Sequence, residues 1–204
     1  RGRLVGSRVL PLERPAYVHD FGLGRHWLVL FDLPMLFSEE ALLDGQPLPY
    51  RWAEAAGGRI GLVPRDREAA PLWFPTDPFC LEHVAAVTEE PSGRVAVDVI
   101  ARPSGDGGDA TLLRLTLDPA RGVCLPEVLA ASPQDLPTGD PRTSTGGRRW
   151  LWTLATDGDG PAPVGTRLYR HDLRGGERVE VSLPEGVRVG ELSYVPAHGR
   201  AAEG

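Results

Sequence analysis

Two histidines of this chain lie where an imidazole could do chemistry. His19 is in the half-apolar run YVHDF, just before a strongly apolar segment, and His83 is in the run FCLEHV. In a strand, Leu81, His83 and Ala85 are expected to share one face. An imidazole that projects inward among apolar residues is costly unless its nitrogens find hydrogen-bond partners or a metal ion. Each of the two is therefore a satisfied structural histidine or a metal ligand, and the residues alone leave both interpretations open.

The other histidines and the cysteines indicate structure rather than catalysis. His26 opens an apolar run, His171 stands at a predicted hairpin, and His198 lies in a Gly-rich C-terminal stretch. Each is interpreted as a surface or satisfied structural histidine. Cys80 and Cys124 match neither a disulfide framework nor the spacing of a zinc site, so they are predicted to be free thiols in a reducing compartment.

Familiar catalytic motifs are absent from the sequence. There is no GxSxG nucleophile elbow, no Walker phosphate loop and no HExxH pair. Carboxylates are plentiful but scattered, so no acid/base couple for glycoside hydrolysis stands out. The Gly-rich stretches lack the strand-then-helix context that a phosphate cradle needs.

Short strand-like runs bounded by turn residues dominate the chain. Strands are predicted at His26–Asp32, Arg59–Pro64, Arg94–Ala101, Thr111–Leu117, Trp150–Ala155, Arg167–Asp172, Arg178–Leu183 and Glu191–Pro196. In the third of these, valines alternate with other residues, which predicts a strand with one apolar face. One short helix is predicted from Ser38 to Leu43, with Ser38 as its N-cap and Gly45 as its terminator.

These elements predict an all-β protein. A meander of short, turn-linked strands is typical of a propeller, a sandwich or a barrel. Polar segments rich in Gly and Pro occur at 103–110, 139–149 and 157–165, between strands of similar character. They are predicted to be surface loops of one domain.

The composition excludes some classes of function. The 204 residues carry 22 basic side chains, all arginine, against 28 acidic ones, a net charge of −6. This balance argues against nucleic-acid binding, because phosphates need a basic face. With 41% hydrophobic residues the chain can bury a core. No apolar run is long enough to span a membrane, so a cytoplasmic protein, free or peripheral on a membrane, is expected.

Several segments, taken in order, resemble the carotenoid cleavage oxygenase family, which includes the lignostilbene dioxygenases. They are YVHDFG at 17–22, HWLVLFDLP at 26–34, RIGLVPR at 59–65, Phe79 with His83, VAVDV at 95–99, DLP at 135–137 and GELSYVP at 190–196. No single segment is decisive, but together and in family order they cover nearly the whole chain.

The resemblance implies a seven-bladed β-propeller with an Fe(II) ion held on its axis by four histidines. Such an enzyme uses O₂ to split a carbon–carbon double bond of a carotenoid, apocarotenoid or stilbene into two carbonyl products. By position, His19 matches the second iron ligand and His83 the third. Asp135 stands where the family has a glutamate that supports the third ligand, and Glu191 where another supports the fourth.

The sequence also departs from the family pattern. Asp135 is one methylene shorter than glutamate, which predicts a long or water-mediated contact with His83. Residues 86–88 (AVT) replace the usual Asn-Ala-Tyr, and Leu192 stands where proline is usual. No segment resembles the first or fourth ligand, and a seven-bladed propeller needs about 300 residues. Residues 1–204 are therefore expected to form a partial propeller domain of about three to four blades, a central-to-late fragment whose activity requires the full-length protein.

One apolar segment fits a hydrophobic substrate. Leu33, Met35, Leu36 and Phe37 either pack in the core or form an apolar lip at the mouth of a substrate tunnel. Such a lip could touch a membrane that stores the polyene, and the resemblance places this region near the cavity entrance. The alternative function is that of a non-catalytic propeller remnant that binds a partner or a hydrophobic ligand.

Overall fold

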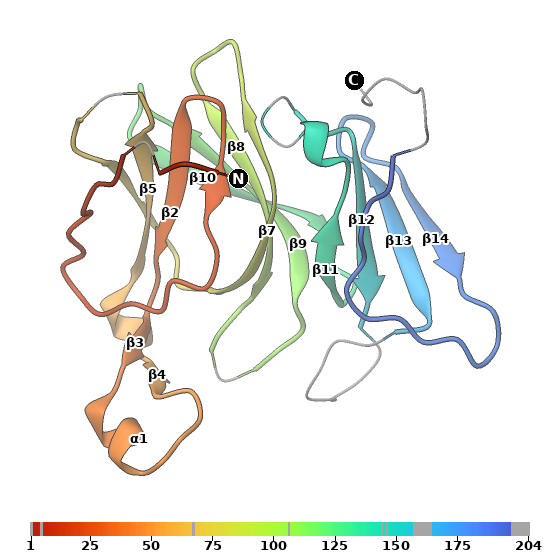
Figure 1. Cartoon of the computed structure of the whole chain (residues 1–204), viewed down its shortest axis with the longest axis horizontal. Helices are drawn as coiled ribbons and strands as arrows, with labels where there is room; N and C mark the ends of the chain where they lie inside the picture. The colour runs from red at the N-terminus through yellow and green to blue at the C-terminus, as the bar shows by residue number, and fades with distance from the viewer. Residues whose placement is uncertain are drawn as a thin grey trace.

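Three four-stranded antiparallel sheets dominate the structure (Figure 1). The computed structural model describes residues 2–4, 6–66, 68–105, 107–143, 145, 147–156 and 165–196. The first sheet has the strand order β1 (Gly22–Leu23), β2 (Trp27–Asp32), β5 (Gly58–Pro64) and β6 (Leu72–Thr76). The second comprises β7 (Cys80–Glu89), β8 (Val95–Arg102), β9 (Thr111–Asp118) and β10 (Val123–Ala130). The third comprises β11 (Gln134–Thr138), β12 (Trp150–Ala155), β13 (Arg167–Asp172) and β14 (Arg178–Ser182).

The sheets pack against one another in chain order. One core cluster includes Phe31 and Ile60 of the first sheet and Val97 of the second. Another joins Leu112 of the second sheet to Leu151 of the third. The first strands of the sheets lie side by side, since β7 contacts both β1 and β11. This is how successive blades of a β-propeller are arranged, and the all-β prediction is confirmed.

Most of the predicted strands form within one residue of their predicted ends. Trp150–Ala155 and Arg167–Asp172 are reproduced as β12 and β13. The strand predicted at Glu191–Pro196 is wrong, because this segment is irregular. A strand needs a neighbour for its backbone groups. In the described part of the chain, pairing beyond β14 is limited to a single bridge between Gly165 and Val189.

Strand β8 is buried on both faces, so the prediction of a single apolar face is wrong. Residues 95–101 are all buried, because β8 lies between β7 and β9 while the neighbouring sheets cover its faces. Asp98 is only 2% exposed. Its carboxylate accepts two hydrogen bonds from Arg114 on β9, at 2.7 and 2.9 Å. This bidentate pairing offsets the cost of burying a charge.

An excursion interrupts the first sheet between β2 and β5 and projects away from it (Figure 1). Its elements are β3 (Met35–Phe37), α1 (Glu39–Leu43), β4 (Tyr50–Trp52) and the 3-10 turn η1 (Glu54–Ala56). The predicted caps of the helix are confirmed. Ser38 Oγ accepts a hydrogen bond from the backbone N–H of Ala41 at 3.2 Å, and Gly45 follows the helix with φ of +73°.

The described residues of the loops predicted at 103–110 and 139–149 lie between strands as expected, and the 3-10 turn η2 (Pro141–Thr143) lies within the second. Residues 157–164 of the third predicted loop, and His198, lie outside the described residues. Among the helices that the structure describes, none has the length and apolar character needed to cross a membrane.

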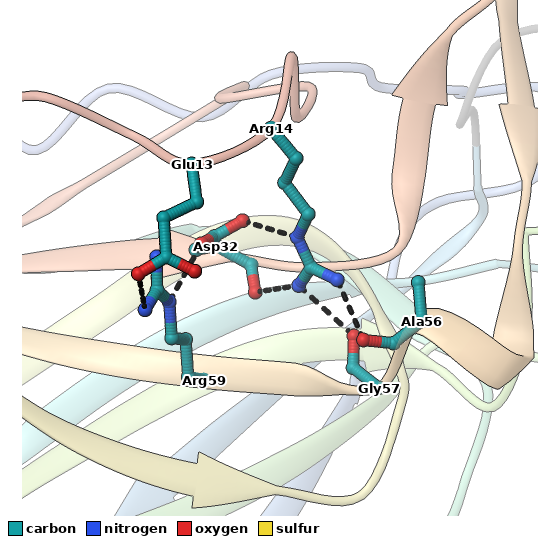
Figure 2. Close-up of polar contacts among 6 residues, drawn as sticks. All are labelled: Glu13, Arg14, Asp32, Ala56, Gly57 and Arg59. Carbon is teal, nitrogen blue, oxygen red and sulfur yellow. Dashed lines mark hydrogen bonds and ion pairs between the residues drawn. The ribbon is translucent and has the colours of Figure 1, made fainter.

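A buried polar cluster ties the N-terminal segment to the first sheet (Figure 2). Asp32, at the end of β2, is fully buried. Nε of Arg14 and Nε of Arg59 each donate to its carboxylate at 2.7 Å. Arg14 also donates to the backbone oxygens of Asp32, Ala56 and Gly57 at 2.7–3.0 Å. Because a buried carboxylate requires such partners, the matched runs HWLVLFDLP and RIGLVPR have a structural role here.

Candidate metal centre

His19 lies on the segment that leads into β1. The backbone N–H of Tyr17 donates to Met35 at 2.7 Å and that of Phe37 to Pro15 at 2.9 Å, which holds this segment against β3. Nδ1 of His19 lies 2.9 Å from the Tyr17 hydroxyl. A metal at Nε2 requires the proton on Nδ1, and the Tyr17 oxygen can accept that hydrogen bond.

His83 lies on β7 at an irregular point of the strand. The pairing of β7 with β8 shifts between Leu81 and His83 and again between Val84 and Ala86. Leu81 belongs to the core between the first and second sheets, and Ala85 to the core between the second and third. The prediction that these residues share one face with His83 is therefore wrong. A bulge re-aims the side chains that follow it, and bulges are frequent beside functional sites.

The fold brings the two imidazoles together. The ring centroids of His19 and His83 are 5.6 Å apart, and the rings are inclined by 64°. The histidines are distant in sequence, and they meet because β1 and β7 are in contact. Both predicted ligands thus lie at one place, beside the first strands of two adjacent sheets.

Asp135, on β11, contacts His83 directly. Its Oδ1 lies 2.8 Å from Nδ1 of His83, so the expected long or water-mediated contact is wrong. The contact between β11 and β7 makes up for the missing methylene. The hydrogen bond to Asp135 raises the pKa of His83, against the opposing effect of burial. Because a carboxylate can only accept, Nδ1 carries the proton and Nε2 is left for a metal.

The backbone beside this carboxylate is unusual. Leu136 has φ of +52°, the sole positive value at a non-glycine residue in the described ranges. Its N–H donates to Oδ1 of Asp135 at 2.7 Å. The pairing of β11 with β12 shifts between Asp135 and Thr138. This conformation costs a residue with a Cβ about 1–2 kcal/mol, and it is found where Asp135 is presented to His83.

Glu191 is separate from this arrangement. It is exposed and lies in the irregular segment beyond β14, and the hydrogen bonds of His19 and His83 given above do not include it. The interpretation of the other two described histidines is confirmed. His26 is exposed and lies 2.6 Å from Glu89, whereas His171 is buried, with Nε2 3.1 Å from Thr153 Oγ1.

The residues present fit part of an iron centre. Imidazole nitrogens suit Fe(II), and His19 and His83 both have a partner for the Nδ1 proton. Within the residues that the structure describes, no group of three or more His, Cys, Asp or Glu side chains is arranged to hold a metal ion. This part of the chain therefore offers two imidazoles and the carboxylate that orients one of them.

A groove with both apolar and charged walls opens beside His19. Tyr17, Met35 and Leu81 are among the residues that line it. Cys80 lies there too as a free thiol, and burial raises its pKa to about 11. The thiol is therefore neutral near pH 7, whereas the ion pair of Glu82 and Arg102 adds charged groups to the wall of the groove.

The segment predicted as an apolar lip has two different parts. Leu33 is 4% exposed and belongs to the core, so a membrane contact through it is wrong. Met35 and Leu36 are half-buried in β3. Phe37 is 41% exposed and stands at the start of the excursion. Only the outer end of the segment is thus available to a surface.

Comparison with known proteins identifies the family of this chain. The family model described as RPE65, retinal pigment epithelial membrane protein, matches residues 2–204. The chain therefore belongs to the RPE65 family of carotenoid oxygenases, and the resemblance predicted from the sequence is confirmed.

Individual relatives match at low identity. A carotenoid cleavage oxygenase of Mycobacterium tuberculosis is 27% identical over 241 residues, which cover 91% of this chain and 48% of that protein. An isoeugenol monooxygenase of Pseudomonas putida is 31% identical over 86 residues, covering 42% of this chain and 18% of that protein. The chain spans about half the length of the first of these relatives.

Solved structures show the same fold. A variant of the Synechocystis apocarotenoid oxygenase superposes with a TM-score of 0.79 at 21% identity, covering 92% of this chain and 43% of that one. A cobalt-substituted form of that oxygenase gives a TM-score of 0.76 at 20% identity, with the same coverage. The predicted fold class, part of a β-propeller, is confirmed.

Two contributors to the site were not predicted from the sequence. Tyr17 lies two residues before His19 in the run YVHDF, and this proximity was the available signal. The N–H of Leu136 gives no sequence signal, because a left-handed leucine is uncommon.

Proposed function

We propose that the full-length protein uses O₂ to cleave a carbon–carbon double bond of a carotenoid, apocarotenoid or stilbene. The observation that carries the proposal is the convergence of His19 and His83 within 5.6 Å, with Asp135 on the Nδ1 side of His83. Similarity to a carotenoid cleavage oxygenase and to an isoeugenol monooxygenase supports the same class of reaction.

The metal that we propose is Fe(II), held by Nε2 of His19 and Nε2 of His83 together with ligands from outside the described residues. When bound, the iron would supply the site at which O₂ is activated for reaction with the double bond. The cobalt-substituted form of the Synechocystis oxygenase supports a metal in a protein of this fold.

The chain's own residues would orient and shield this site. Asp135 accepts the Nδ1–H of His83, which fixes the tautomer and the ring orientation. Tyr17 can accept the Nδ1–H of His19 in the same way. The apolar side of the groove, which includes Met35 and Leu81, would contact a hydrophobic polyene or stilbene beside His19.

Metal analysis of the full-length protein tests the proposal. We expect about one Fe per chain, sharply reduced by His83→Ala. His26→Ala is the matched control, because His26 also pairs with a carboxylate, Glu89, but is exposed. Two carbonyl products should form from an apocarotenoid or stilbene in the presence of O₂. A wild-type protein without iron or cleavage activity would instead support the non-catalytic propeller that binds a hydrophobic ligand.

We also propose that the excursion touches a membrane surface. Phe37, Leu42, Leu43 and Leu48 are 41%, 52%, 80% and 50% exposed, and they lie on or beside β3, α1 and the connection to β4. Exposed apolar groups on one projecting element are typical of peripheral membrane contacts. We expect co-sedimentation with phosphatidylcholine vesicles that is lost in Leu42→Asp/Leu43→Asp. Equal sedimentation of the variant would contradict this contact.

A further inference from the structure

One carboxylate connects the two segments that carry the histidines. Asp20 follows His19 directly, and its Oδ2 accepts a hydrogen bond from the backbone N–H of Val84 at 2.8 Å. Val84 in turn follows His83. Oδ1 of Asp20 accepts from the N–H of Phe21 at 2.7 Å. The Asp20 carboxylate therefore accepts hydrogen bonds from Phe21, the next residue, and from Val84, the residue that follows His83.

The hydrogen bond between Val84 and Asp20 lies at an edge strand of the second sheet. β7 is the first strand of its sheet, so its edge away from β8 is not paired within that sheet. The pairing with β8 shifts on either side of His83 and Val84. At this interrupted point the Val84 N–H donates to the Asp20 carboxylate. A hydrogen bond to an ionised acceptor is stronger than a neutral one.

We propose that Asp20 is a positioning residue that fixes the separation of His19 and His83. The inference rests on the proposed metal site formed by these two side chains. Two imidazoles can bind one metal ion only if both nitrogens reach it at about 2.0–2.1 Å, and such sites tolerate displacements of about 0.5 Å. A tether from the His19 segment to the His83 segment sets this separation before any metal binds.

Three substitutions separate a tether from a general structural role. Asp20→Ala removes both acceptors, Asp20→Asn keeps an amide oxygen that can accept from Val84, and Asp20→Glu keeps the charge on a longer side chain. The matched control is Asp118→Ala. Oδ1 of Asp118 also accepts two backbone hydrogen bonds, from Ala120 and Arg121 at 3.1 and 3.2 Å, but in the turn between β9 and β10.

The probe is Cu²⁺ alone, which binds paired imidazoles more tightly than the other divalent first-row metals do. Its affinity for the chain is measured by calorimetry, and the number of nitrogen ligands by electron paramagnetic resonance. Hydrogen exchange of the Val84 amide reports the tether without any metal. His19→Ala and His83→Ala define the signal that arises from the two-histidine site.

We expect Asp20→Ala to weaken Cu²⁺ binding at least tenfold, to remove one nitrogen from the copper spectrum and to speed exchange of the Val84 amide. Asp20→Glu should weaken binding severalfold while the chain stays folded. Asp20→Asn should restore most of the affinity, and Asp118→Ala should match the wild type.

Two results would overturn the inference, and they are distinguishable. If Asp20→Ala and Asp20→Glu bind Cu²⁺ like the wild type while His83→Ala does not bind, the metal site stands and the tether is wrong. If His19→Ala and His83→Ala both bind Cu²⁺ like the wild type, the metal site itself is wrong, and the tether falls with it.

Discussion

His83 is half-buried and His171 is buried, and their surroundings shift the pKa of the imidazole in opposite directions. At His83, the hydrogen bond to Asp135 raises the pKa of the imidazole. At His171 on β13, burial lowers the pKa to about 4. Thr153 uses its hydroxyl hydrogen on Gln134 at 2.8 Å, so Nε2 of His171 must donate to the Thr153 oxygen. Nε2, the nitrogen left for a metal at His83, is engaged with Thr153 at His171.

The difference indicates that a carboxylate partner on Nδ1, which leaves Nε2 available, distinguishes a candidate ligand from a structural histidine. Neighbouring residues of β11 take part in both arrangements: Asp135 contacts His83 of the second sheet, while Gln134 contacts Thr153, the partner of His171. Successive side chains of a strand point to opposite faces. Strand β11 therefore supplies a carboxylate, Asp135, to the candidate metal centre on one face and a neutral amide, Gln134, to a buried hydrogen-bond network on the other.

The largest expected effect is on the free energy of unfolding at acid pH, and it comes from the buried network of His171, Thr153 and Gln134. The pKa of His171 is about 4 in the folded chain against 6.5 for an ordinary histidine, so the unfolded state takes up the proton first as the pH falls. This stabilisation is present above pH 6.5 and is lost between pH 6.5 and 4, by about 3 kcal/mol. The free energy of unfolding in urea, measured at pH 7 and at pH 4, should therefore fall less between the two pH values in His171→Gln than in the wild type. An equal loss in both proteins would contradict the burial of a neutral imidazole, and His26→Gln serves as the exposed control.

The next largest effect concerns metal binding at His83. Asp135→Ala should lower the affinity for a divalent metal about 10- to 100-fold, because the carboxylate orients His83. Calorimetric titration with Cu²⁺ measures the change. Thr153→Val is the counterpart at His171 and should leave the metal affinity as it is. If both variants bind alike, the contrast between the two histidines has no bearing on metal binding.

Thr153→Val should instead reduce the free energy of unfolding by about 2 kcal/mol, since it leaves two buried polar partners without their hydrogen bonds. Thr153 is fully buried, and it bonds to both Gln134 and His171. Urea unfolding at pH 7 measures the loss. A variant as stable as the wild type would show that the network adds specificity without adding stability.

The smallest effect concerns the backbone that presents Asp135. Leu136→Val should cost about 1 kcal/mol, because a β-branched residue fits a left-handed conformation poorly. Leu136→Gly should be nearly neutral, since relief of the strain offsets lost packing and added freedom of the unfolded chain. Urea unfolding of the two variants separates them. Equal stabilities would show that the left-handed φ at Leu136 stores no strain.

The local parts of the fold could be predicted from the sequence. The strands at Trp150–Ala155 and Arg167–Asp172 follow from short strand-like runs between turn residues, and the Ser38 cap follows from a side chain that can accept a hydrogen bond from the nearby backbone. His19 and His83 could be singled out by their setting and by the order of the matched segments.

The parts set by other sheets could not be predicted. Whether β8 is covered on one face or two depends on sheets that the chain builds before and after it. The direction of His83 depends on the shifts in pairing with β8. The direct reach of Asp135 depends on how closely β11 approaches β7. The irregular segment at Glu191–Pro196 has strand-like residues, but in the described part of the chain it has no strand beside it.

The cluster around Asp32 has a consequence for how the family can vary in length. Arg14 bonds to Asp32, which immediately precedes the excursion, and to Ala56 and Gly57, which end it (Figure 2). The two ends of residues 33–57 are thus joined at one point by side-chain bonds in addition to the β2–β5 ladder. Insertions or deletions between those ends would change the size of the excursion and leave the register between β2 and β5 as it is.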